Sequence, residues 1–319
     1  MNILQNDVRN LQEVSNEDRK LLHDFTERTA PNSLAYEHSW GYIIQATRYA
    51  KLRWYDPANN ALIFFGRKSA YDQTLVIPAF FATPQYLHNI LPFIQKLLDS
   101  PQVILKNIDP LEMPLYLPHD FRGYSEHEYW SEDAKFDDQT YPQLIVNLHT
   151  LLQKHGQGYR KLRRYLYAAT AKRCTMRPYT ERDNTTVRYL LALKDNNSAG
   201  RYTTSHEMYP SSATNKYIIE QNSRIIGFTV TSTVSTICTA VCAGIFLPDE
   251  PELAPWALYR TMATEYHNGF RFANLGGSET IGTLEFKRQL FQPVRALHRT
   301  HLVFDGTKRS SYASFDTGL

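Results

Sequence analysis

Cysteine is scarce in this chain of 319 residues, which contains only Cys174, Cys238 and Cys242. An odd and sparse set does not build a disulfide framework and is typical of a reducing compartment. The spacing of Cys238 and Cys242 does not match a zinc motif, and free cysteine is usually buried. We therefore expect the cysteines to be small core side chains and the protein to be cytoplasmic.

Several catalytic signatures are also missing. The chain has no G-x-S-x-G motif, no GxxxxGK[ST] loop and no G-x-G-x-x-G following a strand, which argues against serine hydrolases and common nucleotide-binding folds. His298 and His301 flank a predicted strand, but two histidines without a third ligand do not make a metal site. We therefore expect no metal and no resident cofactor.

Neither sign of charge dominates, because the net charge is only +3. A net charge of this size does not by itself imply a polyanionic partner. Hydrophobic residues make up 42% and charged residues 21%, a composition typical of globular proteins. A chain of this length exceeds what one hydrophobic core usually organises. We expect two domains, residues 1–138 and 139–319, with an acidic stretch, Glu126–Asp138, as the loop between them.

One run without charge, Ile225–Phe246, is long enough to span a bilayer. It is rich in Thr, Ser and Val, which favour sheet over helix, so it predicts two buried strands of a hairpin. The first twenty residues are polar and mixed in charge, unlike a signal or transit peptide. We therefore expect no integral membrane segment.

Both halves show strands followed by a helix and a further strand, which predicts a mixed α/β fold. In the first half, short strand-like runs between Ser39 and Phe81, including Tyr42–Ile44, precede an apolar helical pattern over residues 84–98 that contains Pro92. In the second half the predicted hairpin is followed by an amphipathic helix at 252–267, a strand at 270–275, a helix carrying Leu284 and Phe291, and a strand at 298–304.

Acidic residues are absent from Gln139 to Thr180, a stretch with eight Lys and Arg side chains. Four of them, Arg160, Lys161, Arg163 and Arg164, lie in a predicted helix over 159–171 and would suit phosphate groups. The alternative is a solvated basic face that balances the acidic stretch. Tyr159 would either stack on a base or pack in the core.

Two motifs in the second half carry a family resemblance. Asn274-Leu-Gly-Gly-Ser-Glu279, followed by Leu284-Glu-Phe-Lys-Arg-Gln-Leu-Phe-Gln-Pro293, resembles the glycine, short gap and Phe-Lys-x-x-Phe signature of two families. These are the Fem-type peptidoglycan aminoacyltransferases and the C-terminal domain of phosphatidylglycerol lysyltransferase. Here three residues, not two, separate Lys287 from Phe291. The segment Gly158–Arg164 is similar to the basic Gly-x-x-x-x-x-Arg helix of the lysyltransferase-like group.

The resemblance implies a tandem of two domains with the fold of Gcn5-related N-acetyltransferases, active in the C-terminal half. It implies that Lys287 lies near the reacting carbonyl, where a cation would stabilise an oxyanion; the alternative is a lysine on a helix surface. Glu279 would orient or deprotonate an attacking amine, or merely favour a helix N-terminus. Asn274 and Ser278 lie where a strand meets a helix and would bind substrate, as would Arg288.

The acyl donor is suggested by a missing glycine-rich loop. Plain acetyltransferases hold the pyrophosphate of coenzyme A on backbone N–H groups at a helix N-terminus. The corresponding residues here, Leu247–Pro255, include no glycine, three prolines and three carboxylates, which disfavours acetyl-CoA. The resembled families take their acyl group from aminoacyl-tRNA. We therefore expect a tRNA acceptor end as partner and an amine or hydroxyl acceptor, such as a small metabolite, a cell-wall precursor or a lipid head group.

Two other functions stay open. One is a coenzyme A-dependent N-acyltransferase with an altered site. The other is a non-catalytic tandem module that binds RNA or a metabolite, for which nucleic-acid binding would depend steeply on salt.

Overall fold

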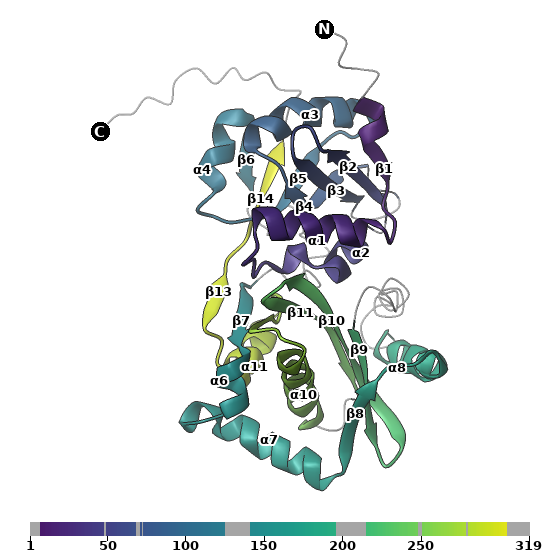
Figure 1. The fold of residues 1–319 in the computed structure, drawn as a ribbon, viewed down its shortest axis with the longest axis vertical. Coiled ribbons are helices and arrows are strands. Elements are labelled where there is room, and N and C mark those ends of the chain that lie inside the picture. The colour runs from purple at the N-terminus through teal and green to yellow at the C-terminus, as the bar shows by residue number, and fades with distance from the viewer. Residues whose placement is uncertain are drawn as a thin grey trace, which may run out of the picture. The chain divides into compact units, whose positions relative to one another are not determined.

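The computed structural model describes residues 7–47, 49–67, 71, 73–124, 141–195, 215–247, 251–278 and 280–304. The chain forms two compact units (Figure 1). The first comprises Met1–Val14, Ala46–Glu132 and Arg299–Leu319, and the second comprises Ser15–Gln45 and Asp133–His298. Relative to the expected boundary at residue 138, each unit therefore includes a segment from the other half of the sequence.

The first unit is built on a seven-stranded sheet in the order β1-β2-β3-β4-β5-β14-β6. Only β4 and β5 pair in parallel, and helix α3 connects them. The strands are β1 (Leu11–Glu13), β2 (Leu52–Asp56), β3 (Ala61–Arg67), β4 (Leu75–Phe81), β5 (Val103–Ile108), β6 (Phe121–Tyr124) and β14 (Thr300–Phe304). The helical elements are η1 (Asp7–Asn10), α3 (Pro84–Leu97), α4 (Met113–Tyr116) and η3 (Leu117–His119).

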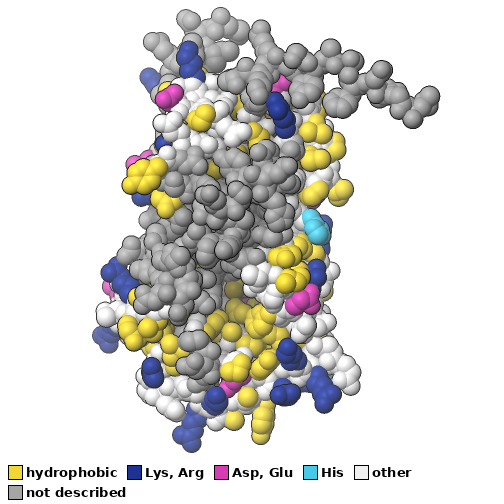
Figure 2. Space-filling model, turned by 180° about the vertical axis from the view of Figure 1, so that it is seen from behind, with side chains coloured by type: hydrophobic (Ala, Val, Ile, Leu, Met, Phe, Trp, Pro, Cys, Tyr) yellow, Lys and Arg dark blue, Asp and Glu magenta, His cyan; other side chains and the backbone are white. Residues whose placement is uncertain are grey.

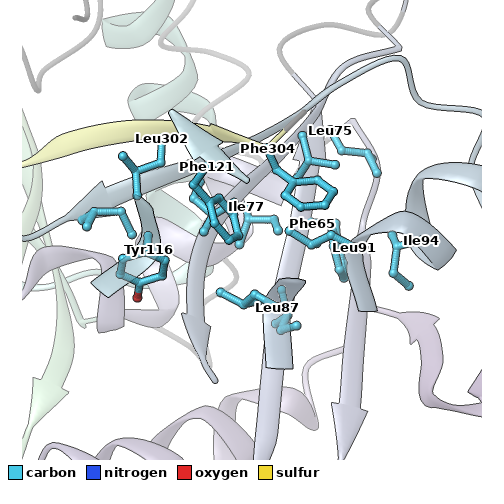
Figure 3. Close-up of a cluster of buried hydrophobic side chains, with 14 of the residues drawn as sticks. Phe65, Leu75, Ile77, Leu87, Leu91, Ile94, Tyr116, Phe121, Leu302 and Phe304 are labelled. Carbon is cyan, nitrogen blue, oxygen red and sulfur yellow. The ribbon is translucent and has the colours of Figure 1, made fainter. Parts of the chain in front are cut away.

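The core of the first unit lies between α3 and one face of this sheet. Leu87, Leu91 and Ile94 of α3 recur at helical spacing and point toward the strands (Figure 3). They pack against side chains that include Ile77 of β4 and Phe304 of β14, all of them buried. The C-terminal strand β14 therefore completes a core that the first third of the chain begins.

The second unit has a seven-stranded sheet in the order β13-β7-β12-β11-β10-β9-β8, in which only β11 and β12 are parallel. Its strands are β7 (Gln143–Asn147), β8 (Cys174–Pro178), β9 (Asn215–Gln221), β10 (Arg224–Ser235), β11 (Cys238–Phe246), β12 (Phe272–Asn274) and β13 (Arg295–Leu297). Helix α10 connects β11 to β12, so the second unit repeats the parallel strand, helix, strand arrangement of the first.

Helices cover both faces of the second sheet. One face packs against α7, α10 and α11, through residues such as Leu162, Met262 and Leu284. On the other face, Val187 and Leu191 of α8 contact β9 and β10. The helical elements are α1 (Asp18–Thr29), η2 (Tyr36–His38), α2 (Trp40–Thr47), α6 (Leu148–Gln153), η5 (Gln157–Tyr159), α7 (Arg160–Ala171), η6 (Glu181–Asp183), α8 (Asn184–Asp195), α10 (Leu253–His267) and α11 (Ile281–Phe291).

The predicted mixed α/β architecture is confirmed, and so is the hairpin, because β10 and β11 pair antiparallel across Ile225–Phe246. Within the described residues, no helix is both long enough and apolar enough to cross a lipid bilayer. The strand predicted at Tyr42–Ile44 is wrong, since these residues belong to helix α2. The hydroxyl of Ser39 accepts a hydrogen bond from Tyr42 N at 3.4 Å, as an N-cap does, and tertiary packing buries Ile43.

The connection from β8 to α8 depends on a buried carboxylate. Arg177 donates two hydrogen bonds to Asp183, at 2.7 and 2.8 Å, and Thr180 N donates a third at 2.7 Å. The bonded guanidinium holds the pKa of Asp183 well below its usual range. Because the folded-state pKa is depressed, this stabilisation is complete above the unfolded-state value of about 3.9 and is lost as pH falls through the folded-state pKa.

We therefore expect Asp183→Asn to lower the free energy of unfolding at pH 7 by about 1–2 kcal/mol, a modest loss because Arg177 is partly exposed. The difference from wild type should narrow as the pH falls below about 4. Urea unfolding followed by circular dichroism measures both. Asp24→Asn, an exposed change on α1, is the control and should show no such pH dependence. A difference that stays constant from pH 7 to pH 3 would contradict the assignment.

Candidate functional site

The candidate site lies where β12 ends and the chain turns toward α11. Strands β11 and β12 pair only from Cys238 with Phe272 to Ala240 with Asn274, after which β12 stops and β11 continues. The carboxyl ends of parallel strands are places where open sheets commonly bind ligands. The glycine-containing residues 275–278 follow directly, and Gly276 has a φ of 66°, a conformation that suits glycine.

Lys287 lies on the inward face of α11 and not on its solvent face. It is three residues from Leu284 and from Leu290, both of which are buried. Its ammonium donates hydrogen bonds to Leu275 O, at 2.8 Å, and to Gly277 O. A half-buried cation is thereby fixed against the backbone that follows β12. The sequence shows only that Lys287 belongs to a motif. The structure shows that two backbone carbonyls hold its ammonium in one position.

Asn274 and Ser278 begin and end this turn, and both are buried. The Asn274 amide donates to Leu34 O at 2.6 Å and to Gln143 Oε1 at 2.8 Å, and its carbonyl accepts from Gly276 N at 2.7 Å. These bonds give Asn274 a structural role in shaping the turn, and a binding role stays a prediction. The hydroxyl of Ser278 has no hydrogen-bond partner among the described residues, so it retains donor and acceptor capacity beside Gly277. Glu279 lies outside the described residues.

The basic helix α7 packs beside α11. Lys161 Nζ donates to Gln289 Oε1 at 3.1 Å, and Gln292 Nε2 donates to Gly158 O at 3.3 Å. The structure therefore brings the two resembled motifs together in one unit. Among the described residues no hydrogen bond or ion pair joins Lys287 itself to the arginines of α7.

The arginines of α7 differ in their contacts. Arg160 and Arg164 are exposed and make no hydrogen bond or ion pair with any residue that the structure describes, whereas Arg163 Nη1 donates to the carbonyls of Lys154 and Gly156. Tyr159 is buried in the core, and this burial raises its pKa. It therefore packs. Arg288 is exposed on α11 and pairs with Glu285 at 3.5 Å, a weak surface interaction.

The N-terminus of α10 carries an anion of its own. Glu252 immediately precedes the helix, is buried, and forms an ion pair with Lys172. The hydrogen bond from Lys172 lowers the pKa of Glu252, so the carboxylate is charged at neutral pH. A pyrophosphate at this helix end would lie beside the ion pair of Glu252 and Lys172. That acetyl-CoA is disfavoured stays a prediction, because residues 248–250 of the proline-rich loop lie outside the described residues.

The structure also contains a buried acid that the sequence does not reveal. Glu265 of α10 is fully buried, and its Oε1 accepts hydrogen bonds from Thr231 at 2.6 Å and Tyr217 at 2.9 Å. Asn215 and Asn268 donate to the same carboxylate at 3.2 and 3.3 Å. Burial, together with this neighbouring carboxylate, raises the pKa of Tyr217. The only available signal was that Glu265 is the one acidic residue of α10.

No protein-family model and no curated protein sequence matches the chain. Solved structures do match over nearly its full length. L-PGS from Bacillus licheniformis has a TM-score of 0.64 at 15% identity, covering 94% of each chain. FemX has a TM-score of 0.60 at 8% identity, covering 92% of this chain and 97% of the other.

A tandem GNAT protein from the clavulanic acid biosynthesis pathway has a TM-score of 0.52 at 9% identity, covering 93% of this chain and 98% of the other. At these low identities, the similarity to the three structures is one of fold. They confirm the resemblance read from the motifs at that level, including the tandem arrangement of two acyltransferase-type units.

Proposed function

We propose that the chain is an aminoacyltransferase that moves an amino acid from aminoacyl-tRNA onto an amine or hydroxyl acceptor. The observation that carries the proposal is the ammonium of Lys287, which the carbonyls of Leu275 and Gly277 hold at the end of β12. Two further observations support it: α7 with its arginines packs beside α11, and the N-terminus of α10 already carries the charge of Glu252.

The chemistry needs little besides positioning and charge. The acceptor nitrogen or oxygen attacks the ester carbonyl of the donor, and a new C–N or C–O bond forms as negative charge develops on the carbonyl oxygen. A fixed cation stabilises that oxyanion in a site partly shielded from water. The intermediate then collapses, the bond to the ribose oxygen breaks, and the ribose hydroxyl receives the proton that the acceptor lost. In this proposal Lys287 supplies the cation, and Ser278, whose buried hydroxyl has no hydrogen-bond partner among the described residues, is assigned a substrate-binding role.

A direct test compares the two possible acyl donors. The full-length protein is incubated separately with radiolabelled aminoacyl-tRNA and with acetyl-CoA, each with a panel of amines and hydroxyl acceptors. We expect label to move from tRNA to an acceptor and acetyl-CoA to remain intact. Consumption of acetyl-CoA without turnover of aminoacyl-tRNA would instead support a coenzyme A-dependent acyltransferase. Turnover of neither, with RNA still bound, would support a non-catalytic module.

A further inference from the structure

An open pocket of about 470 Å³ lies between the end of α6 and the first turns of α7. Its lining consists of Gln153, Lys154, His155, Gly156, Gln157 and Arg163. Two of these residues are cationic, one is a histidine, two carry amide groups, and none is acidic. The composition therefore suits an anion with several oxygen acceptors.

The cations of this pocket are held in place by the protein. Lys154 Nζ donates to Leu152 O at 2.9 Å and to Tyr259 Oη at 2.6 Å, and it lies 4.8 Å from the centroid of the Tyr259 ring. Arg163 Nη1 closes the loop by donating to Lys154 O at 2.5 Å and to Gly156 O at 3.0 Å. Side chains fixed in this way lose little entropy when an anion binds.

A row of exposed side chains leads away from the pocket along α7. Arg160, Arg163, Arg164 and Tyr167 are spaced i, i+3, i+4 and i+7, so they share one face of the helix. All four are exposed, and Tyr167 is 80% exposed. Figure 2 shows Lys and Arg side chains gathered at the bottom of the view, the end at which α7 lies in Figure 1. We refer to these four residues as the α7 stripe.

We propose that the pocket binds a phosphate of single-stranded RNA and that the α7 stripe continues the contact, with Tyr167 stacking on a base. The inference rests on the proposed function and deepens it, because it locates the 3′ strand of the donor tRNA on this unit. Proteins that bind single strands combine a basic track with exposed aromatic rings. Consecutive turns of α7 present cations about 5.4 Å apart, which suits a row of phosphates better than one isolated anion. A free phosphate, unlike a nucleotide, offers no base on which the exposed ring of Tyr167 could stack.

Fluorescence anisotropy with a labelled single-stranded RNA of twelve nucleotides ending in CCA tests the inference on the full-length protein. Removing the two arginines of the stripe that make no hydrogen bond or ion pair with any described residue, Arg160→Ala with Arg164→Ala, should weaken binding about 10–100-fold and reduce the salt dependence. Tyr167→Ala should weaken binding about tenfold with the salt dependence unchanged. Because these side chains make no structural contacts among the described residues, the variants should fold. Arg163→Ala tests the pocket itself, with circular dichroism to confirm folding.

Matched controls lie on the helical segment that covers the other face of the same sheet. Arg182→Ala and Tyr189→Ala make the same chemical changes at exposed positions and should leave RNA affinity unchanged. Equal RNA affinity of wild type and the α7 variants would overturn the inference. So would binding to vesicles of phosphatidylglycerol that the α7 variants weaken while RNA binding is unaffected.

The assay separates this inference from the proposed function. If wild type transfers amino acids from tRNA and the α7 variants keep the same kcat/KM, the function stands and the α7 stripe is not the RNA site. If the variants lose RNA binding but wild type transfers nothing, the RNA site stands and the proposed reaction fails.

Discussion

Lys287→Ala is expected to lower kcat for aminoacyl transfer by about 10²–10³-fold, the usual effect of removing one group that stabilises an oxyanion. The affinity for RNA should change little, because the arginines of α7 and the pocket at Arg163 are intact. The loss should therefore appear in kcat and in kcat/KM alike, as for an interaction made mainly in the transition state. Single-turnover transfer from labelled aminoacyl-tRNA measures it.

The substitution also removes two hydrogen bonds to the turn after β12, so folding must be measured alongside activity. Two such bonds at a half-buried site contribute about 1–3 kcal/mol, less than the stability of a typical domain. Lys287→Arg keeps the charge and should recover part of the activity. Lys96→Ala, the same exchange on the exposed face of α3, is the control. Transfer by folded Lys287→Ala within twofold of wild type would remove this residue from the mechanism.

Glu265→Ala should produce the largest loss of stability, about 3–5 kcal/mol in the free energy of unfolding. The change removes the acceptor of the Thr231 and Tyr217 hydroxyls, which are buried and cannot turn to water. Each unsatisfied buried donor costs about 1–3 kcal/mol, and the space left by the side chain adds to this. Guanidinium unfolding followed by tryptophan fluorescence and circular dichroism measures the shift in midpoint.

Two further variants locate the source of that loss. Glu265→Gln keeps one carbonyl oxygen as an acceptor and should lose clearly less stability than the alanine variant. Glu285→Ala, on a partly exposed position of α11, should change the unfolding free energy by no more than about 0.5 kcal/mol. If Glu265→Ala unfolds within about 1 kcal/mol of wild type, the carboxylate is not the organising acceptor that its contacts indicate.

Sequence patterns predicted the helices and strands that depend on residues close together in the chain. The hairpin at 225–246 follows from uncharged, β-branched residues, and the long helix α3 forms despite Pro92 because its apolar positions recur at helical spacing. The strand predicted at Tyr42–Ile44 failed because aromatic and β-branched residues also fit a buried helix. The N-cap at Ser39 was the signal that distinguishes the two structures.

The candidate site was only partly predictable. The motif around Lys287 predicted an important lysine, but not that the carbonyls of Leu275 and Gly277 hold its ammonium. Glu265 could not be found from sequence because its donors come from β9, from β10 and from the end of its own helix, which only folding brings together. The α7 stripe was visible as a basic run; that Tyr167, rather than Tyr159, is its exposed ring depends on helix packing.

The position of β14 limits how the chain can be truncated to express the first unit alone. Residues 300–304 are inserted between β5 and β6, so a fragment that ends before residue 299 leaves both of those strands with open hydrogen-bonding edges and a core without Phe304. Unpaired edges of this kind promote aggregation. No single cut therefore releases the first unit intact, and a version that folds alone would need its last strand joined to residue 124 by a designed linker.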